Sequence, residues 1–246
     1  PIAVSPDGLN INAKCGATAP EALQAQVAAH GADLGIALDG DADRLIMVDE
    51  RGRVIDGDQL MATIAGGWAR RGRLRGAALV ATVMSNLGLE RRLKAEGLTL
   101  ERTKVGDRYV VEHMRSNGHN LGGEQSGHLI FRRELSTGDG MVSGRHVCEL
   151  VLRHGPLGSQ ATAAWERAPQ TLVNIPRDVY DDAAVHSDID ESLGRFGLDR
   201  ASIRLVIRPS GTEPLIRVMV ESTNGNFIHD VDTALRARFG LSPAPK

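Results

Sequence analysis

Short apolar runs alternate with longer amphipathic segments along the chain, and this alternation predicts the strands and helices of an α/β fold. The clearest run, residues 34–38, lies between Asp33 and Asp39 and predicts a buried strand. Apolar side chains at four-residue spacing within 57–71 predict an amphipathic helix. Further strands are expected at 45–48, 79–83, 98–105, 172–175, 203–208 and 215–220. Further helices are expected at 109–115, 138–154 and 228–239, and at 85–97 with Ser85 as the N-cap.

The pattern weakens between His154 and Gln170, where glycine and proline recur, and this predicts a linker followed by a smaller unit. A length of 246 residues with 41% hydrophobic and 24% charged content is typical of a globular chain with more than one domain. The chain opens at Pro1 without an initiator methionine, which favours a segment of a longer protein over methionine removal.

The formal net charge of -2 comes without the basic block that nucleic-acid binding requires, and aromatic residues make up only 3% of the chain. Nucleic acid is therefore excluded as an expected partner. The chain shows neither an apolar run near the roughly 18 residues that span a bilayer nor a signal-peptide pattern. Cys15 and Cys148 match no metal or redox spacing, so we expect a soluble cytoplasmic protein with reduced thiols and no membrane partner.

Three carboxylates alternate in residues 39–44, Asp-Gly-Asp-Ala-Asp-Arg, which we call the acidic loop. Two unit charges ~5 Å apart repel by about 3 kcal/mol at an effective dielectric of about 20, so Asp39, Asp41 and Asp43 need a cation if they converge. Ligand sets made of oxygen alone favour Mg²⁺ or Ca²⁺, and Mg²⁺ commonly shares its shell with substrate phosphate. Arg44 adds a guanidinium for phosphate oxygens. The loop therefore indicates magnesium and phosphate chemistry.

Two other interpretations of the acidic loop differ in strength. A solvated acidic turn stays open, because loops between strands are often rich in aspartate and glycine. A calcium loop of the EF-hand type is rejected, although Glu50 stands at the twelfth position, because Arg44 stands at the sixth, where that loop needs glycine. Predicted strands rather than helices also flank the segment.

A second polar segment, residues 122–128, has the sequence Gly-Gly-Glu-Gln-Ser-Gly-His, and we call it the Glu124 loop. Its carboxylate, amide, hydroxyl and imidazole suit a ligand with many hydroxyls, such as a sugar. A polar turn with a helix-capping serine is an equally good interpretation of the residues alone.

A third segment, residues 208–214, has the sequence Arg-Pro-Ser-Gly-Thr-Glu-Pro after a predicted strand, and we call it the Arg208 loop. Its guanidinium, hydroxyls and glycine can cradle phosphate, with Arg217 as a further cation. It lacks the glycine-lysine-serine/threonine ending of a Walker A loop, and an ordinary β-turn stays open.

Residues 104–108, Lys-Val-Gly-Asp-Arg, lie at a predicted strand-to-helix junction, where helix N-termini favour anions. A surface salt bridge would explain the same residues. His113 and His119 show no recognisable ligand spacing, so we interpret them as ordinary helix or loop residues.

In their order and separations, the three loops resemble the α-D-phosphohexomutase family, whose members have four domains, and the likeness covers essentially the whole chain. Segments 6–12, 15–18 and 105–109 resemble the members that act on glucosamine phosphates. Gln125 agrees with this, because members that act on mannose or glucose phosphates commonly have methionine there.

The resemblance implies mixed-sheet α/β phosphohexomutase domains followed by a smaller α+β C-terminal domain. It divides the chain into 1–57, the end of domain 2 with the metal loop; 58–158, the sugar-binding domain 3; 159–169, a linker; and 170–246, the phosphate-binding domain 4.

The resemblance also assigns roles to residues. It implies that Asp39, Asp41 and Asp43 hold Mg²⁺. The substrate-binding residues that it implies are Glu124, Ser126, Arg108, Arg208, Ser210, Gly211, Thr212 and Arg217. Arg44, Lys104 and His128 are its candidates for positioning or general acid/base work.

In such enzymes a phosphoserine donates its phosphoryl group to glucosamine 6-phosphate, the bisphosphate reorients, and glucosamine 1-phosphate leaves. No serine in this sequence is followed by the His-Asn-Pro of the family's nucleophile, so we expect the chain alone to be inactive and its partner to be the missing N-terminal half of the same protein. A parent acting on mannose or glucose phosphates and a non-catalytic sugar-phosphate-binding module stay open as alternatives. The oligomeric state also stays open, with a homodimer as one candidate.

Overall fold

The computed structural model describes residues 1–246 except 136, 163–164, 212 and 244–246. Two compact units make up the chain, unit 1 (Pro1–Glu166) and unit 2 (Arg167–Lys246). The division between them falls inside the 159–169 segment that the sequence predicts as a linker. The first part of that segment is helical, because a short helix covers Leu157–Thr162.

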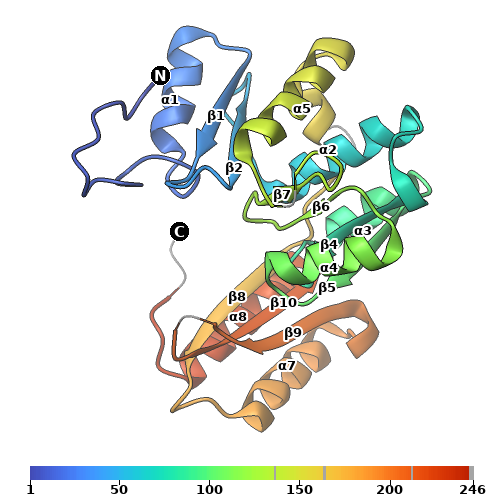
Figure 1. The fold of residues 1–246 in the computed structure, drawn as a ribbon. Helices are drawn as coiled ribbons and strands as arrows, with labels where there is room; N and C mark the ends of the chain where they lie inside the picture. Colours follow the sequence, from blue (N-terminus) through green and yellow to red (C-terminus); the bar gives the residue numbers. More distant parts are fainter. Residues whose placement is uncertain (136, 163–164, 212, 244–246) are drawn as a thin grey trace. The chain divides into compact units, whose positions relative to one another are not determined.

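Unit 1 contains two sheets and six α-helices among its described residues (Figure 1). In chain order its elements are α1 (Glu21–His30), β1 (Leu34–Leu38), β2 (Leu45–Asp49), β3 (Val54–Ile55), α2 (Gly57–Arg70), the 3-10 turn η1 (Arg75–Ala77), β4 (Ala78–Thr82), α3 (Leu87–Ala95), β5 (Thr99–Thr103), α4 (Asp107–Asn117), β6 (Gly122–Gly123), β7 (Leu129–Ile130), α5 (Gly140–His154) and α6 (Leu157–Thr162).

The first sheet of unit 1 is antiparallel, with the order β1-β2-β3, and the second is mixed, with the order β5-β4-β6-β7. In the mixed sheet β4 runs parallel to β5 and β6, whereas β7 runs antiparallel to β6. All five residues of β4 are buried, as expected of a central parallel strand with a continuous apolar sequence. The mixed α/β sheets that the sequence predicts are therefore present.

One hydrophobic core joins the two sheets of unit 1. Helix α2 contributes Leu60, Ile64 and Trp68 to it, the four-residue repeat that the sequence shows. Strand β2 adds Leu45 and Met47 from the antiparallel sheet, and the mixed sheet adds residues of β4. Because β2 is anchored in this core, the end of the loop that precedes it is fixed.

The predicted cap of α3 is wrong by one residue. Asn86, rather than Ser85, is the N-cap, and its side-chain oxygen accepts a hydrogen bond from the Gly88 N–H at 2.8 Å. Serine and asparagine are both good caps, and the backbone decides between them: the Asn86 N–H donates to Asp58 Oδ2 at 2.8 Å, which fixes the turn immediately before Leu87.

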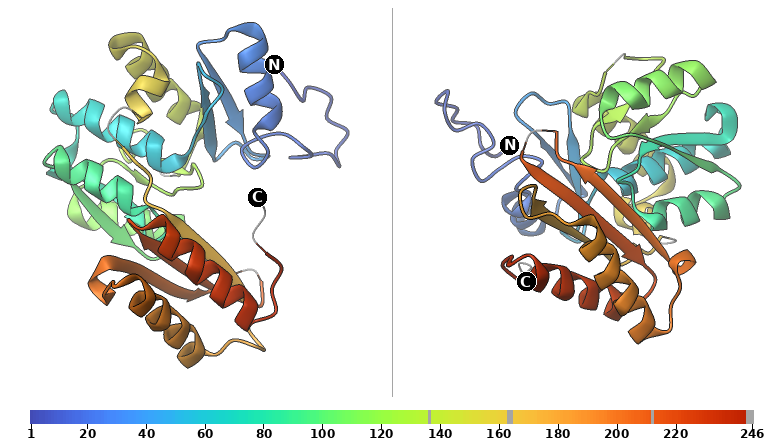
Figure 2. Two further views of the ribbon diagram at one scale, coloured as in Figure 1. Left: turned by 180° about the vertical axis from the view of Figure 1, so that it is seen from behind. Right: turned by 90° about the horizontal axis from the view of Figure 1, so that it is seen from below.

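Unit 2 is a three-stranded antiparallel sheet with the order β8-β10-β9 and two long helices on one face of it (Figure 2). Its elements are β8 (Gln170–Pro176), α7 (Asp182–Phe196), the 3-10 turn η2 (Arg200–Ser202), β9 (Ile203–Pro209), β10 (Leu215–Ser222) and α8 (Gly225–Arg238). Val218 and Val220 of β10 point into the core under the helices. Arg217, between core positions, therefore lies on the opposite face of the sheet.

The sequence-based expectation lacks three helices, α1, α6 and α7, and the two-residue strands β3, β6 and β7. The signal for α7 was present: Asp181 is the N-cap, Val185, Ile189 and Leu193 form an apolar row, and Gly197 ends the helix in the left-handed region. The sequence signal for α1 is weaker, because Val27 is the only buried residue of this helix and Pro20 at its N-cap makes no side-chain hydrogen bond. Among the described residues, no helix is both long and apolar enough to cross a bilayer.

Candidate functional site

The acidic loop closes the hairpin between β1 and β2, whose end residues Leu38 and Leu45 face each other. Ala42 adopts a left-handed backbone with φ of 58°, and its N–H donates to the Asp39 carbonyl at 3.1 Å. One oxygen of each carboxylate, from Asp39, Asp41 and Asp43, lies within 4.8 Å of the other two. The hairpin turn therefore converges the three charges on one spot, as the alternating sequence suggested.

Arg44 partly offsets this charge from the edge of the loop. Its Nε lies 3.6 Å from Asp39 Oδ2 and 3.7 Å from Asp43 Oδ1, and its side chain is 46% exposed. Its backbone N–H also donates to Asp39 Oδ1 at 3.1 Å. The exposed guanidinium stays accessible to an anion that approaches the carboxylates.

His128, which is buried, bonds Asp43 from the other side. Its Nδ1 lies 3.0 Å from Asp43 Oδ2, and its Nε2 accepts a hydrogen bond from the Gly138 N–H at 3.1 Å. Because Nε2 accepts, the ring proton sits on Nδ1 and is donated to the carboxylate. His128 therefore orients Asp43 with both ring nitrogens engaged.

Asp43 Oδ1 fits a bound cation. This oxygen is buried and has no hydrogen-bond partner among the residues that the structure describes. A buried carboxylate oxygen without a donor is costly, and a metal ion would complete its environment. With Asp39 and Asp41 converging on the same spot, the donor set consists only of oxygen and suits Mg²⁺.

The Glu124 loop is held against the end of the acidic loop by backbone hydrogen bonds. The Leu45 N–H donates to the Gly127 carbonyl at 3.0 Å, and the Gly57 N–H at the start of α2 donates to the Gln125 carbonyl at 3.1 Å. Gly127 has φ of 93°, and a Cβ there would lie 2.1 Å from the Leu45 carbonyl oxygen. Only glycine allows this approach.

The 104–108 segment meets the same loop at Glu124. The Gly106 N–H donates to Glu124 Oε1 at 3.0 Å, and the hydroxyl of Ser126 donates to Oε2 at 3.4 Å. Lys104 and Arg108 are exposed and flank Tyr109, with Arg108 Nη2 donating to the Tyr109 hydroxyl. Hydrogen bonds thus link the acidic loop, the Glu124 loop and the 104–108 segment of unit 1, and Gly106 is the residue of the last segment that contacts Glu124.

Sequence reasoning missed a fourth segment, residues 138–140. Gly138 fixes the His128 ring, and the Gly140 N–H at the start of α5 donates to the Ala42 carbonyl at 2.8 Å. The sequence feature that could have indicated this segment is Asp139, a helix-capping residue between two glycines. Its side chain accepts a hydrogen bond from the Val142 N–H.

In unit 2 the Arg208 loop connects β9 to β10 and presents two arginines. Arg208 lies directly opposite Arg217 in the antiparallel pairing, so both side chains leave the same face of the sheet. Arg217 donates to Glu213 Oε2 at 2.9 Å, and its Nε is buried without a hydrogen-bond partner among the described residues. Glu213 offsets part of the charge of Arg217, and two guanidinium groups on one face of the sheet can together bind an anion.

Ser210 and Gly211 of the Arg208 loop differ in how accessible they are. Ser210 is 8% exposed, and its N–H donates to the Leu215 carbonyl at 2.8 Å. Gly211 is exposed, and a Cβ there would meet no atom within 4 Å, so neighbouring atoms do not fill the space above it. Thr212, which the sequence analysis assigns to the phosphate site, lies outside the described residues.

Sequence comparison defines the class of protein to which this fold and these loops belong. Three models of phosphoglucomutase/phosphomannomutase match in succession: alpha/beta/alpha domain II at residues 4–52, alpha/beta/alpha domain III at 56–168 and the C-terminal domain at 177–238. The chain belongs to the phosphoglucomutase/phosphomannomutase family, and the resemblance to phosphohexomutases is confirmed.

Within this family, the chain is similar to curated proteins named phosphoglucosamine mutase. The chain is 54% identical to the phosphoglucosamine mutase of Granulibacter bethesdensis over 224 residues, which cover 90% of this chain and 49% of the relative. It is 50% identical to the phosphoglucosamine mutase of a Ruegeria species over 248 residues, covering 96% of this chain and 54% of the relative. The chain thus spans about half the length of the curated relatives it matches.

Solved structures confirm the fold. A phosphoglucomutase/phosphomannomutase family protein of Burkholderia thailandensis matches with a TM-score of 0.70 and 23% identity, covering 90% of this chain and 50% of that one. The N-acetylphosphoglucosamine mutase of Aspergillus fumigatus, in complex with GlcNAc-6P and magnesium, matches with a TM-score of 0.67 and 23% identity, covering 93% of this chain and 54% of that one.

Proposed function

We propose that this chain supplies the metal, sugar and phosphate sites of a phosphohexomutase that interconverts glucosamine 6-phosphate and glucosamine 1-phosphate. The observation that carries the proposal is the convergence of Asp39, Asp41 and Asp43 around a buried Asp43 oxygen that lacks a hydrogen-bond partner among the described residues. Relatives that are 50 to 54% identical and named phosphoglucosamine mutase support the choice of substrate class.

In this proposal the three aspartates hold Mg²⁺, which when bound would polarise a phosphoryl oxygen and offset the charge that develops on it. Arg44 binds the same phosphoryl group from the edge of the loop, because its guanidinium is exposed and within 4 Å of two of the carboxylates. His128 acts on Asp43 and not on the substrate, since both of its ring nitrogens are engaged within the protein.

The Glu124 loop would bind the sugar. Glu124 accepts from the Gly106 N–H through Oε1, which orients the carboxylate and leaves acceptor capacity on Oε2 for a sugar hydroxyl. Ser126 is exposed beside it. Gln125 adds a buried amide nitrogen that has no partner among the described residues, and such a group is expected to find one in the substrate complex.

The Arg208 loop would bind the phosphate that is not transferred. Arg208 and Arg217 supply two guanidinia on one face of the sheet, and Ser210, Gly211 and Thr212 supply backbone and hydroxyl donors. The exposed cations Lys104 and Arg108 are proposed for binding the substrate phosphates and for proton transfer near the sugar. The phosphoserine that donates the phosphoryl group would belong to a part of the protein beyond this chain, so the chain alone would bind ligands without turnover.

Magnesium titration of the chain by calorimetry tests the metal assignment. Asp41→Asn removes an exposed carboxylate of the acidic loop, so we expect Mg²⁺ affinity to fall at least tenfold with little effect on folding. Asp33→Asn, an equally exposed acid just before β1, is the matched control and should leave the affinity unchanged. Equal Mg²⁺ affinity in wild type and Asp41→Asn would refute the proposed ligand set.

The substrate class is tested on an intact protein that includes the part with the phosphoserine. We expect turnover of glucosamine 6-phosphate to exceed that of mannose 6-phosphate and glucose 6-phosphate. Gln125→Met should lower kcat/KM for the amino sugar more than for the other two, because the unpaired amide is the polar group lost. A preference for mannose or glucose phosphate would instead support a phosphomannomutase or phosphoglucomutase.

A further inference from the structure

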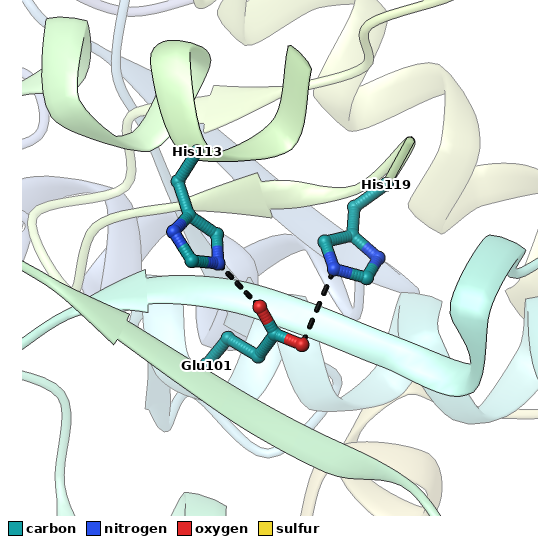
Figure 3. Close-up of side chains that lie close together, drawn as sticks. All are labelled: Glu101, His113 and His119. Carbon is teal, nitrogen blue, oxygen red and sulfur yellow. Dashed lines mark hydrogen bonds and ion pairs between the residues drawn. The ribbon is translucent and has the colours of Figure 1, made fainter. Parts of the chain in front are cut away.

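A second cluster of ligand-type side chains lies in unit 1 and shares no residue with the sites assigned above. Glu101 comes from β5, His113 from α4, and His119 from the turn that follows α4. Figure 3 shows the carboxylate between the two imidazoles, with one oxygen facing each ring. Glu101 Oε2 contacts His113 Nε2, and Glu101 Oε1 lies 3.3 Å from His119 Nε2. One ligand atom of each residue lies within 4.8 Å of the other two.

His119 is the most buried of the three residues. It is 6% exposed, and its Nδ1 faces the Arg75 carbonyl oxygen at 3.4 Å. Gly76 makes room for the ring, because a Cβ there would lie 2.7 Å from Nδ1 and Cε1. A proton on Nδ1 donated to the carbonyl leaves the lone pair on Nε2, the arrangement in which a backbone carbonyl orients a metal-binding histidine.

That lone pair faces Glu101. His119 Nε2 is buried and forms no hydrogen bond with any described residue, although Glu101 Oε1 is only 3.3 Å away. Two acceptors at this distance repel unless a cation lies between them. Ligands 2.0 to 2.1 Å from a tetrahedral ion stand about 3.3 Å apart along each edge of the tetrahedron, and the 3.3 Å between His119 Nε2 and Glu101 Oε1 matches one such edge.

We propose that Glu101, His113 and His119 form a Zn²⁺ site with one open coordination position. Two imidazoles and one carboxylate are a donor set that zinc uses when it keeps its fourth position for water, whereas Mg²⁺ prefers oxygen ligands. The side chains of His113 and Glu101 are 33% and 31% exposed, so solvent can reach the fourth position.

Zinc would also join separate elements of unit 1. It would tie β5 to α4 and to the turn after α4, because one ligand comes from each of them. Since the unfolded chain lacks this arrangement, binding should stabilise unit 1.

Zinc titration of the chelator-treated 246-residue chain tests the site, followed by calorimetry and by thermal unfolding. We expect one equivalent of Zn²⁺ to bind and to raise Tm, and excess Mg²⁺ to leave that equivalent in place. Glu101→Gln, His113→Gln and His119→Gln should each weaken zinc at least tenfold and remove the rise in Tm. Two control variants should keep the wild-type zinc affinity and the rise in Tm. They are His30→Gln, at an exposed histidine of α1, and Asp41→Asn, in the acidic loop.

Cobalt(II) gives a readout that does not depend on the folding of any variant. Bound to the wild-type chain, Co²⁺ should show the intense visible d–d bands of a four-coordinate ion with nitrogen ligands, and Zn²⁺ should abolish them. A weak six-coordinate spectrum, or zinc binding that persists undiminished in His119→Gln, would overturn the proposal. Glu101 would then serve only as a charge partner of protonated imidazoles.

Discussion

Two clusters in unit 1 each place three ligand-type atoms within 4.8 Å of one another, yet their chemistry differs. The acidic loop offers only carboxylate oxygens, from Asp39, Asp41 and Asp43. The second cluster offers the Glu101 carboxylate and two imidazoles. Proximity is the same in both, so the ligand atoms decide the ion: oxygen alone favours Mg²⁺, and the mixed nitrogen and oxygen set favours Zn²⁺.

The two clusters also differ in how the fold supports them. The acidic loop is a single hairpin turn, held from outside by the Glu124 loop and by the 138–140 segment. The Glu101 cluster spans β5, α4 and the following turn, and a single carbonyl and glycine orient His119. Substitutions that disturb one support should therefore leave the other metal in place.

Of the substitutions that test the support of the acidic loop, Gly127→Ala should have the largest effect on stability and on Mg²⁺ binding. The left-handed backbone costs an alanine of order 1–3 kcal/mol, and the approach to the Leu45 carbonyl adds about 1–3 kcal/mol of overpacking. We expect urea unfolding to show both terms and calorimetry to show weaker Mg²⁺ binding. The zinc equivalent should persist under conditions in which the variant is folded.

Gly155→Ala separates the two terms of that loss. Gly155 has the same φ of 93°, but a Cβ there would meet no atom within 4 Å, so this variant should lose only the backbone term and keep wild-type Mg²⁺ affinity. If both variants lost equal stability, the close approach to Leu45 would contribute nothing, and the support assigned to the Glu124 loop would be incorrect.

Substitutions of His128 should have a smaller and more selective effect on the acidic loop. His128→Gln places no donor where Nδ1 stood, so Asp43 loses its partner, and we expect Mg²⁺ to bind about 10- to 100-fold more weakly. His128→Asn keeps an amide near the Nδ1 position and should retain most of the affinity. Calorimetry at one pH compares the pair.

The outcome of the His128 pair also separates positioning from proton transfer. In the intact enzyme, a positioning role predicts that added Mg²⁺ restores much of the activity of His128→Gln. If activity stayed low at saturating Mg²⁺ while the metal affinity was normal, His128 would act on the substrate and the positioning role would be wrong.

The acidic loop could be predicted from sequence because its three aspartates stand at alternate positions in one short segment between two apolar runs. The sequence left a solvated acidic turn open, and the hairpin between β1 and β2 is what brings the carboxylates together. Among the described residues, seven of the ten strands and five of the eight α-helices followed from the same local periodicity, with the observed bounds within a few residues of those expected, whereas the two-residue strands β3, β6 and β7 did not. In these places local sequence and tertiary structure agree.

The Glu101 cluster could not be read in the same way. Its residues stand 12 and 6 positions apart and belong to three elements, so only the packing of α4 against the mixed sheet brings them together. The interpretation of His113 and His119 as ordinary residues followed from their spacing alone. The missed 138–140 segment has the same cause, because its contacts with His128 and Ala42 depend on where α5 begins.

A fourth histidine, His146 of α5, extends the comparison because it is buried and packs against an aromatic ring of the core. Its ring stacks on Phe131 at 4.3 Å between centroids, and its Nε2 lies 2.9 Å from Glu134 Oε1. Burial lowers the pKa of His146 below its ordinary value of 6.5, although the charge of Glu134 acts in the opposite direction. We therefore expect this residue to respond to pH and not to zinc.

The sign of that response follows from proton binding. Below about pH 6.5 His146 takes up a proton more readily in the unfolded chain than in the folded chain. The contribution of this residue to the free energy of unfolding is therefore present above that pH and is lost as the pH falls. The slope from one such group is at most about 1.4 kcal/mol per pH unit. Urea unfolding at about pH 7.5 and about pH 5.5 should show a smaller loss for His146→Leu than for wild type, whereas His154→Gln, at an exposed histidine of the same helix, should keep the full loss. An unchanged pH dependence in His146→Leu would mean that Glu134 offsets burial completely, and that packing against Phe131 does not keep this ring neutral.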